Sequence, residues 1–233
     1  MKKLLIAAAV VIVGGVGTAH WYYSDRGRFT TEPEFEGLTR TVAGNDIVSD
    51  SDPAAIVRFD PAFRYVGGQK FILYGVADTE QYFFVETDAD NVLVSLYWVQ
   101  FEAYLPDNSY SYNYESSPGR LQLGEFDFYV DTAIIESDPT ARRRGTDGGL
   151  TRQFLASKGY SFPKDFAYAR LVHLTDETRR KELMIIFIED LAPQGLTAAD
   201  LAEGGSDEGR LAEIETRLLE RIRNTLAVLQ PQV

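Results

Sequence analysis

The sequence predicts an α+β domain in which one antiparallel β-sheet of about six to seven strands is covered by a short helix and by a long amphipathic C-terminal helix. Three observations support this prediction. Residues 66–105 contain three consecutive apolar and aromatic runs, and residues 166–174 and 183–189 form a further hairpin pattern. Residues 206–229 carry apolar side chains at helical spacing. Strands grouped before a terminal helix are typical of the α+β class.

A hydrophobic segment precedes this domain. Lys2 and Lys3 are followed by an uncharged run at residues 4–23, which would rise about 30 Å as a helix and could span a bilayer. One interpretation is a signal peptide cleaved after Ala19, at a small-x-small site. The other is an uncleaved membrane anchor, with Trp21 and its aromatic neighbours at the far interface. Both interpretations place the rest of the chain in the cell envelope, either membrane-anchored or secreted and periplasmic.

The chain therefore divides into three predicted parts. Residues 1–23 are the signal peptide or anchor, residues 24–61 a linker or irregular lead-in, and residues 62–233 a single α+β domain. The middle part has scattered Pro and Gly with little apolar periodicity, and we expect it to be mobile before about residue 36. Contact with the membrane is expected through the N-terminal segment alone.

Charge and cysteine content exclude several classes of function. The 233 residues include 23 basic and 35 acidic side chains, which gives a formal net charge of -12. Such a chain lacks the positive surface field that binding to nucleic acid or to an anionic membrane surface requires. It has no cysteine, so disulfides, thiolate nucleophiles and cysteine-ligated zinc are excluded. We expect no cofactor, no metal site and no nucleic-acid partner.

The central strands carry two finer expectations. The first hairpin turn is expected at the polar residues 77–80. The third run, residues 92–105, is long for one strand, and its apolar residues from Val94 to Phe101 cannot all share one face. A bulge or bend near Gln100 is therefore expected.

A tyrosine-rich stretch follows. Tyr110, Tyr112 and Tyr114 alternate strictly, so as a strand they would project from one face. One interpretation is an aromatic platform that stacks on sugar rings or grips a partner chain. The other is an edge strand with half-buried tyrosines whose hydroxyls reach water. Residues 121–130 alternate next and are expected to form one strand.

An arginine cluster stands out in this acidic chain. Arg142, Arg143 and Arg144 lie in a loop that leads to Gly148 and Gly149 at the start of a helix. Backbone amides at a helix N-terminus and guanidinium groups together could bind a phosphate, sulfate or carboxylate. The spacing lacks either common nucleotide-loop motif. The alternative is that these arginines form ordinary surface ion pairs.

The predicted helices have recognisable ends. The short helix has an apolar face from Leu150 onward and a C-terminal stop at Gly159. Thr197 opens a brief helix with a capping-box-like pattern, and Ser206 is expected to cap the long helix. The apolar stripe of the long helix consists of Leu211, Ile214, Leu218, Ile222, Thr225, Leu226 and Leu229. We expect this stripe to lie on the sheet, with the nearly continuous apolar strand 183–189 at the centre of that sheet.

His173 is the one weak catalytic candidate. It is the histidine certain to belong to the exported domain, because His20 adjoins the possible cleavage site. As a general base it could be partnered by Asp165, Asp176 or Glu189, but no spacing in the sequence selects a nucleophile. A structural or surface histidine is the alternative.

Two functions remain from different classes. The first, which we favour, is an exported or membrane-tethered non-catalytic domain that binds a partner protein or a small ligand. That ligand would be anionic if the arginine loop binds it, whereas Tyr110 and Tyr112 mark the second candidate surface. The alternative is an exported hydrolase that uses His173 with nearby carboxylates.

Overall fold

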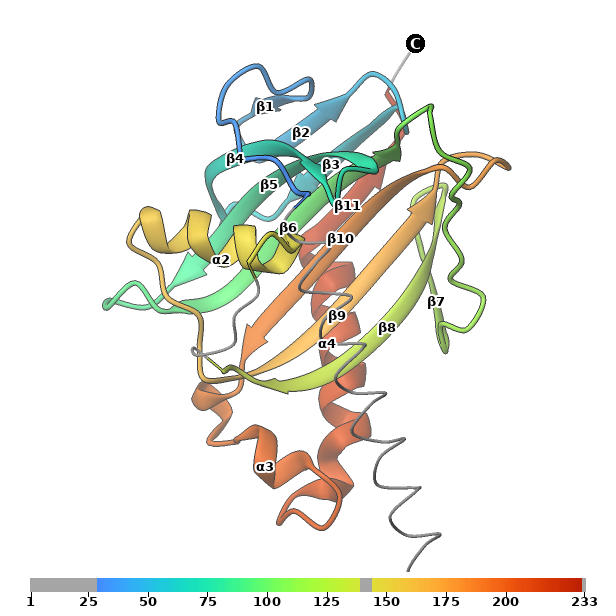
Figure 1. Ribbon diagram of the computed structural model, residues 1–233. Helices are drawn as coiled ribbons and strands as arrows, with labels where there is room; N and C mark the ends of the chain where they lie inside the picture. The colour runs from blue at the N-terminus through green and yellow to red at the C-terminus, as the bar shows by residue number, and fades with distance from the viewer. Residues whose placement is uncertain (1–28, 139–143, 232–233) are drawn as a thin grey trace, which may run out of the picture.

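Two antiparallel sheets and a few helices make up the structure, a computed structural model that describes residues 29–138 and 144–231 (Figure 1). The α+β class is confirmed, but the expected single sheet is two sheets. The seven-stranded sheet contains, in spatial order, β4 (Arg64–Leu73), β5 (Ala77–Thr87), β6 (Leu93–Tyr104), β10 (Lys181–Asp190), β9 (Asp165–Leu174), β8 (Phe126–Glu136) and β7 (Gly119–Leu123). The four-stranded sheet contains β1 (Thr41–Ala43), β2 (Asp46–Ser49), β3 (Ala55–Phe59) and β11 (Leu226–Leu229). The helices are α2 (Asp147–Ser157), α3 (Ala198–Leu201) and α4 (Leu211–Thr225), with 3-10 turns η1 (Ala192–Gln194) and η2 (Glu208–Arg210).

The central hairpins form as predicted, apart from the position of one turn. β4, β5 and β6 are consecutive neighbours, and β10 lies at the centre of the sheet between β6 and β9. The first turn is at Tyr74 and Gly75 rather than at residues 77–80, because both residues adopt a left-handed backbone with φ of +53° and +70°. The Val76 amide donates to the Leu73 carbonyl at 3.0 Å. Three residues, 74–76, therefore separate the paired residues Leu73 and Ala77, and β5 begins directly after them.

β6 runs without the bulge expected near Gln100. Its register with both neighbours is unbroken across residues 95–103. Leu96 and Trp98 join an apolar cluster on one face of the sheet, and Phe101 joins the cluster on the other face. Because both faces are buried, the apolar residues of this strand have no need to share a face.

The run expected as one strand at residues 121–130 is a hairpin of β7 and β8. Its turn passes through Gly124, which has a φ of +59°. A Cβ atom at this position would lie 2.3 Å from the Val228 carbonyl oxygen. Glycine is therefore required at this position for two reasons: the left-handed backbone of the turn and the close approach of β11.

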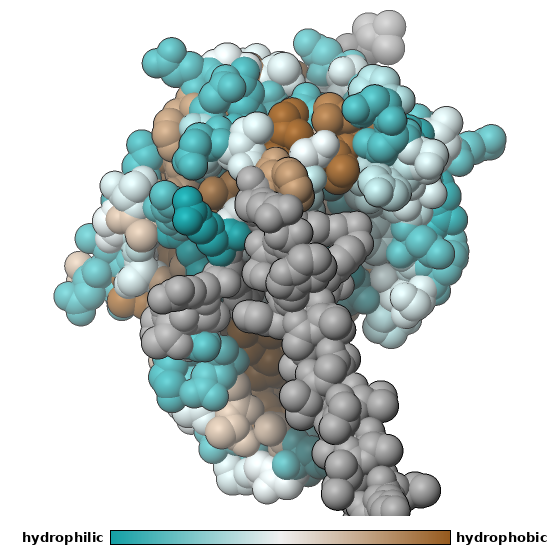
Figure 2. Space-filling view, viewed as in Figure 1, coloured by the Kyte–Doolittle hydropathy of each residue, from teal (hydrophilic) through white to brown (hydrophobic). Residues whose placement is uncertain are grey.

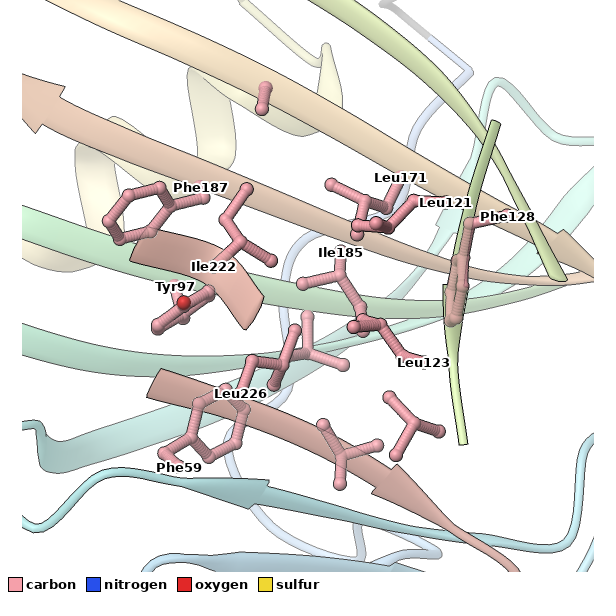
Figure 3. Close-up of a cluster of buried hydrophobic side chains, with 14 of the residues drawn as sticks. Phe59, Tyr97, Leu121, Leu123, Phe128, Leu171, Ile185, Phe187, Ile222 and Leu226 are labelled. Atoms are coloured by element: carbon pink, nitrogen blue, oxygen red, sulfur yellow. The ribbon is translucent and has the colours of Figure 1, made fainter. Parts of the chain in front are cut away.

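The main core lies between the two sheets and α4, on the side of the large sheet away from α2 (Figures 1 and 3). The ring centroids of Tyr97 and Phe187 are 4.6 Å apart, and Phe59 from the small sheet lies 5.1 Å from Tyr97. Ile222 brings the apolar stripe of α4 into the same cluster. The expectation that the C-terminal helix lies on the sheet is therefore confirmed.

The C-terminal helix ends earlier than predicted. α4 stops at Thr225, and the next four residues form β11, which pairs antiparallel with β3. Leu226 and Val228 are buried, whereas Ala227 and Leu229 are more exposed. This period-two burial suits a strand, and β3 offers the backbone groups that complete its hydrogen bonds.

α2 begins and ends with the expected signals. The hydroxyl of its N-cap, Thr146, accepts a hydrogen bond of 3.0 Å from the Gly149 amide. The helix ends just before Gly159, which has a φ of +86°. Its buried face, which includes Leu150 and Phe154, lies against the large sheet, on the side opposite α4 (Figure 1).

The predicted capping box of α3 is present, but the predicted cap of α4 is not. Thr197 and Asp200 exchange side-chain and backbone hydrogen bonds. Ser206 instead donates its hydroxyl to Asp200 at 3.1 Å. α4 starts only at Leu211, because the turn η2 separates it from Ser206.

Much of the expected lead-in belongs to the fold. Its second half forms β1, β2 and β3, and Ile47 and Phe59 are part of the main core. Earlier in the chain, the backbones of Glu34 and Lys70 exchange two hydrogen bonds of 2.9 Å at the free edge of β4. Main-chain hydrogen bonds and burial therefore fix this segment to the rest of the fold, although its composition indicated a linker.

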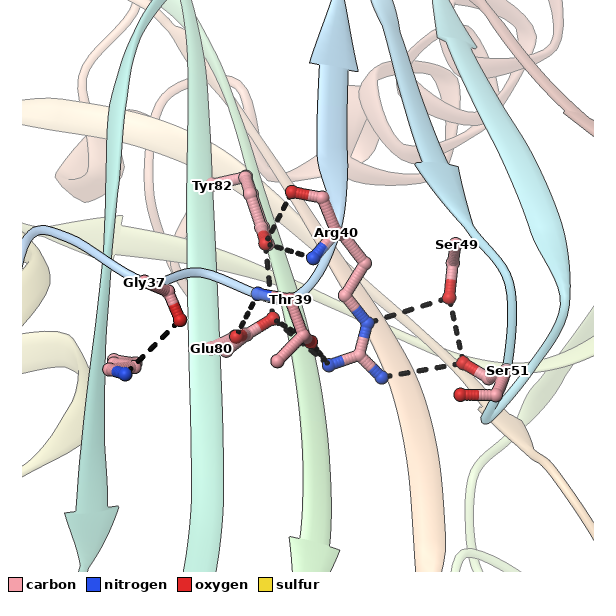
Figure 4. Close-up of polar contacts among 8 residues, drawn as sticks. Gly37, Thr39, Arg40, Ser49, Ser51, Glu80 and Tyr82 are labelled. Carbon is pink, nitrogen blue, oxygen red and sulfur yellow. Dashed lines mark hydrogen bonds and ion pairs between the residues drawn. The ribbon is translucent and has the colours of Figure 1, made fainter.

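A buried carboxylate fixes this segment to the large sheet (Figure 4). Glu80 accepts hydrogen bonds from the Thr39 amide at 2.6 Å and from the Tyr82 hydroxyl at 3.0 Å, and it pairs with Arg40 at 2.9 Å. Burial alone would raise the pKa of Glu80, but the bonds from Thr39 and Arg40 hold that pKa below its usual range. The pair is therefore ionised and fully hydrogen-bonded, as a buried charge requires.

The N-terminal hydrophobic segment predicted at residues 4–23 lies outside the described residues. Within the parts of the chain that the structure describes, no helix combines the length and the apolar character needed to cross a bilayer.

Replacing Leu218 with alanine should destabilise the domain strongly. This side chain is 1% exposed and belongs to the main core. The cavity left behind should lower the free energy of unfolding by about 2 to 5 kcal/mol, measured by urea denaturation. Glu220, an exposed residue of the same helix, provides the control. Glu220→Ala should change stability by less than about 0.5 kcal/mol, and equal effects of the two substitutions would contradict this account of the core.

Candidate functional site

A cavity of about 300 Å³ lies beside α2 on the face of the large sheet opposite α4. Its floor consists of apolar and aromatic side chains from β6, β8, β9 and β10, among them Trp98, Tyr168 and Ile186. Figure 2 shows the same face of the molecule, with hydrophobic patches between hydrophilic residues. α2 packs over β4, β5 and β6, as the ring centroids of Phe154 and Phe83, 4.8 Å apart, show, so among the described residues the strands beyond them are less covered.

Charged side chains of both signs line the same cavity. Asp147 and Arg152 come from α2, and Arg170 comes from β9. Arg170 pairs with Asp131 at 2.8 Å, and Arg152 lies 4.1 Å from the centroid of the Phe162 ring. An apolar floor with a few polar groups at its margin is the usual composition of a small-molecule site.

A row of buried amides supports one wall of the cavity. Gln69 donates to Gln81 at 2.6 Å, Gln81 donates to Gln100 at 2.7 Å, and Gln100 donates to Glu102 at 2.6 Å. The indole N–H of Trp98 donates to the same Gln100 oxygen at 3.2 Å. This row links β4, β5 and β6 through side chains and orients Trp98, the aromatic residue of β6 in the cavity.

Two glutamates stand opposite each other at the end of this row. Glu102 on β6 and Glu182 on β10 are register partners in the antiparallel pair. Side chains at such positions have Cβ atoms about 4.5 to 5.5 Å apart. Glu182 is 2% exposed, whereas Glu102 is partly exposed. Within the described residues, neither carboxyl forms an ion pair with a lysine, arginine or histidine.

Two tyrosines hydrogen-bond this pair. Tyr112 donates its hydroxyl to Glu102 at 2.7 Å, and Tyr114 donates to Glu182 at 2.8 Å. Burial nevertheless raises the pKa of Glu102 to about 7 and that of Glu182 to about 8. The nearby charge of Glu102 adds to the rise at Glu182, and Asp147 acts in the same direction on both. The pair therefore retains protons near neutral pH.

The tyrosine stretch is not the predicted strand. Residues 108–117, which we call the tyrosine strap, have no regular secondary structure. Their side chains nevertheless stack in a row: the Tyr112 ring lies 4.3 Å from Tyr104 and 6.3 Å from Tyr114, in near-parallel orientation. Tyr110 is 47% exposed at one end of this row. The stacking occupies the ring faces that a sugar platform would need, so the half-buried alternative describes Tyr112 better.

The strap has no β-ladder, and side-chain hydrogen bonds and single backbone bonds hold it instead. The Tyr112 amide donates to the Arg179 carbonyl at 2.7 Å, and the Arg179 guanidinium returns a bond of 3.0 Å to the Tyr112 carbonyl. Arg180 donates to the Tyr110 carbonyl at 2.8 Å. At the other end, the Arg170 guanidinium lies 5.3 Å from the Tyr114 ring centroid, so the strap reaches the wall of the cavity.

The predicted anion site is only partly within the described residues. Arg142 and Arg143 lie outside them, and Arg144 is exposed. The Gly149 amide donates to Thr146, and the Gly148 amide donates to the Asp147 carboxylate at 2.7 Å. Both amides therefore have partners within the chain, and a carboxylate lies where an anion was expected.

His173 has a backbone partner rather than a carboxylate. Its Nδ1 atom lies 3.0 Å from the Asp127 carbonyl oxygen, and its ring packs against Phe126 and Phe128. This is the geometry of a structural histidine. Among the described residues, no group of three histidine or acidic side chains is placed to hold a metal ion.

Sequence reasoning identified the tyrosines and the start of α2 but missed the glutamate pair and the cavity. Both depend on which residues of β6 and β10 face each other, and this register is not visible in either strand alone. One signal was present: Gln100 and Glu102 alternate with Val99 and Phe101 in a strand whose other positions, apart from Ser95, are apolar or aromatic. Comparison of the chain with protein-family models, with curated proteins and with solved structures finds no match.

Replacing Glu182 with glutamine should alter how stability depends on pH. In the unfolded chain the glutamate pKa is about 4.3, so between that value and about 8 the folded chain binds more protons. The unfolding free energy of the wild type should therefore fall as pH rises through this window, because the glutamates of the unfolded chain are ionised there while the buried pair still holds protons.

The Glu182→Gln variant loses part of this fall, so its stability relative to the wild type should increase between pH 5 and pH 8. Urea denaturation at four pH values measures the difference. Glu220→Gln, on the exposed face of α4, is the matched control and should follow the wild-type curve. Parallel curves for Glu182→Gln and wild type would contradict the raised pKa.

Proposed function

We propose that this chain is an exported or membrane-tethered, non-catalytic domain that binds a small ligand in the cavity beside α2. The observation that carries the proposal is the cavity itself, about 300 Å³ with an apolar and aromatic floor. Its volume lies at the lower end of the range for ligand pockets. The ligand would have an apolar body of modest size and at least one polar group.

The charges at the cavity favour a neutral or zwitterionic ligand over a simple anion. Asp147 contributes a carboxylate, and Arg152 and Arg170 contribute guanidinium groups. A phosphate or sulfate bound in the cavity would also meet the Asp147 carboxylate, at an electrostatic cost. The anionic ligand expected from the arginine loop is therefore replaced in this proposal by one that offers both hydrogen-bond donors and acceptors.

A binding role is better supported than the hydrolase alternative. His173 contacts a backbone carbonyl, and the glutamate pair does not line the cavity. A general acid or base must reach the reacting atom directly or through one water molecule. Tyr112 is also less suitable as a partner-binding residue than expected, since it is buried.

Filling the cavity from α2 should abolish ligand binding. A Cβ atom at Gly148 would lie 3.8 Å from the Trp98 ring, an ordinary contact, so this cavity-lining position accepts a side chain, and Gly148→Leu would fill part of the cavity. Leucine is also the better helix former, which should leave stability unchanged or raised by up to about 1 kcal/mol. The matched control is Ala156→Leu, at an exposed position of the same helix.

Native and denaturing mass spectrometry of the full chain, purified gently from an exporting host, measures occupancy. Wild type and Ala156→Leu should carry extra mass in the native spectrum only, and Gly148→Leu should not. With Trp21→Phe, Trp98 is the remaining tryptophan, so its fluorescence should change when the extracted ligand is added back. A bare wild-type mass, or ligand retained by Gly148→Leu, would count against the cavity as the site.

Export is tested by the fate of the N-terminus. Expression of the full chain followed by cell fractionation should place it in the envelope fraction. Intact mass distinguishes the two forms: cleavage after Ala19 leaves His20 as the first residue, and an anchor keeps the full mass in the membrane pellet. A soluble cytoplasmic product with an intact N-terminus would contradict the proposal.

A further inference from the structure

The Glu102 and Glu182 pair is an unusual feature for a protein interior. Like charges directly opposite each other on neighbouring strands are destabilising, and burial increases that cost. Here the two carboxyls are register partners, and within the described residues no cation pairs with either. Tyr114 donates to one oxygen of Glu182, and within the same residues no hydrogen bond reaches the other oxygen. Such a pair is most stable when it holds a proton.

We propose that Glu102 and Glu182 form a proton-binding switch that keeps the tyrosine strap closed over the pair when protonated and loosens it when both carboxyls ionise. The strap is the cover most able to move. β6 and β10 are held by an unbroken ladder, whereas the strap has no ladder and is held by side chains, among them Arg120, Arg179 and Arg180, and by single backbone bonds. Segments with few such bonds open at lower free energy than sheet strands.

The direction of the switch follows from linkage. In the closed arrangement burial raises the pKa of both carboxyls, so they bind protons more tightly than hydrated carboxyls do. Loss of those protons must therefore favour an arrangement in which water reaches the pair. Because Tyr112 and Tyr114 donate their hydroxyls to the two carboxyls, we expect these side chains to move when water enters.

Charged and titratable groups face the pair from each element packed on it. Tyr112 and Tyr114 donate from the strap and favour the ionised carboxyls, as does Arg170 from β9 toward Glu182. Asp147 from α2 opposes ionisation of both. Arg170 also contacts the Tyr114 ring and lines the cavity. Movement of the strap would thus alter the cavity wall. An effect of that movement on ligand binding rests on the proposed function, whereas the protonation itself does not.

Hydrogen exchange of the strap tests the switch without any ligand. The amide of Tyr112, bonded to the Arg179 carbonyl, is the reporter. In the full-length chain its protection, corrected for the intrinsic exchange rate, should fall at least tenfold between pH 6 and pH 9. Peptides from β10 should keep their protection, which separates strap opening from global unfolding.

Three variants identify the groups responsible. Glu182→Gln should reduce the fall at Tyr112 to less than threefold. Glu102→Gln removes the like charge, so the midpoint should move to lower pH. Tyr114→Phe removes a donor to the carboxylate, so the midpoint should move to higher pH. A merely structural role for these residues would change protection at every pH and leave the midpoint in place.

Infrared difference spectroscopy checks the protonation directly. At pH 6 the wild type should show a protonated-carboxyl band that Glu182→Gln lacks. Constant protection of Tyr112 across the pH range, an unchanged fall in Glu182→Gln, or absence of that band would each overturn the proposal. Protection that depends on added Na⁺ or Ca²⁺ rather than on pH would assign the pair to a cation and would overturn it as well.

Discussion

Burial on both faces of β6 and β10 is the constraint on which the rest of the structure depends. Side chains on one face, such as Tyr97 and Phe187, need the small sheet and α4 to cover them, and those on the other, such as Trp98 and Ile186, lie on the side of α2. α4 is held there by charge as well as packing, because Arg221 links Glu189 on β10 to Glu86 on β5. The two layers that cover the central sheet are therefore a consequence of its centre being apolar on both faces, and the cavity lies beside α2, where the described residues of the second layer leave space.

The local elements of this fold could be predicted because their signals are local. Alternation identified the central strands, and the Thr197 cap and Gly159 stop were readable as single positions. The second sheet could not be predicted, because it pairs β3 with β11 from the opposite end of the chain. Leu226 satisfies a helical stripe and a strand alternation equally well. Only the free edge of β3 decides between them, and that edge exists only once the fold has formed.

The candidate site was predictable in part for the same reason. Composition drew attention to Tyr112 and to Gly148, which lie near the candidate site, but for other reasons: an aromatic binding surface and an anion site. The tyrosine hydroxyls serve a carboxyl pair, and the glycine lines an apolar cavity. Glu102 and Glu182 were passed over because each looks like an ordinary polar residue near a strand end. Their meaning comes from facing each other across two strands far apart in the sequence.

The buried amide row has a direction. Its Trp98 N–H can only donate, so the side-chain oxygen of Gln100 must face it as the acceptor, and the Gln100 amide N–H then points to Glu102. That orientation fixes Gln81, which in turn fixes Gln69. A slip of one residue in either strand pair would turn these amides into the apolar layer on the other face. The row therefore favours the native register of β4, β5 and β6 over registers shifted by one residue. Hydrophobic burial alone would leave those registers nearly equal in free energy, because both faces of the sheet are apolar.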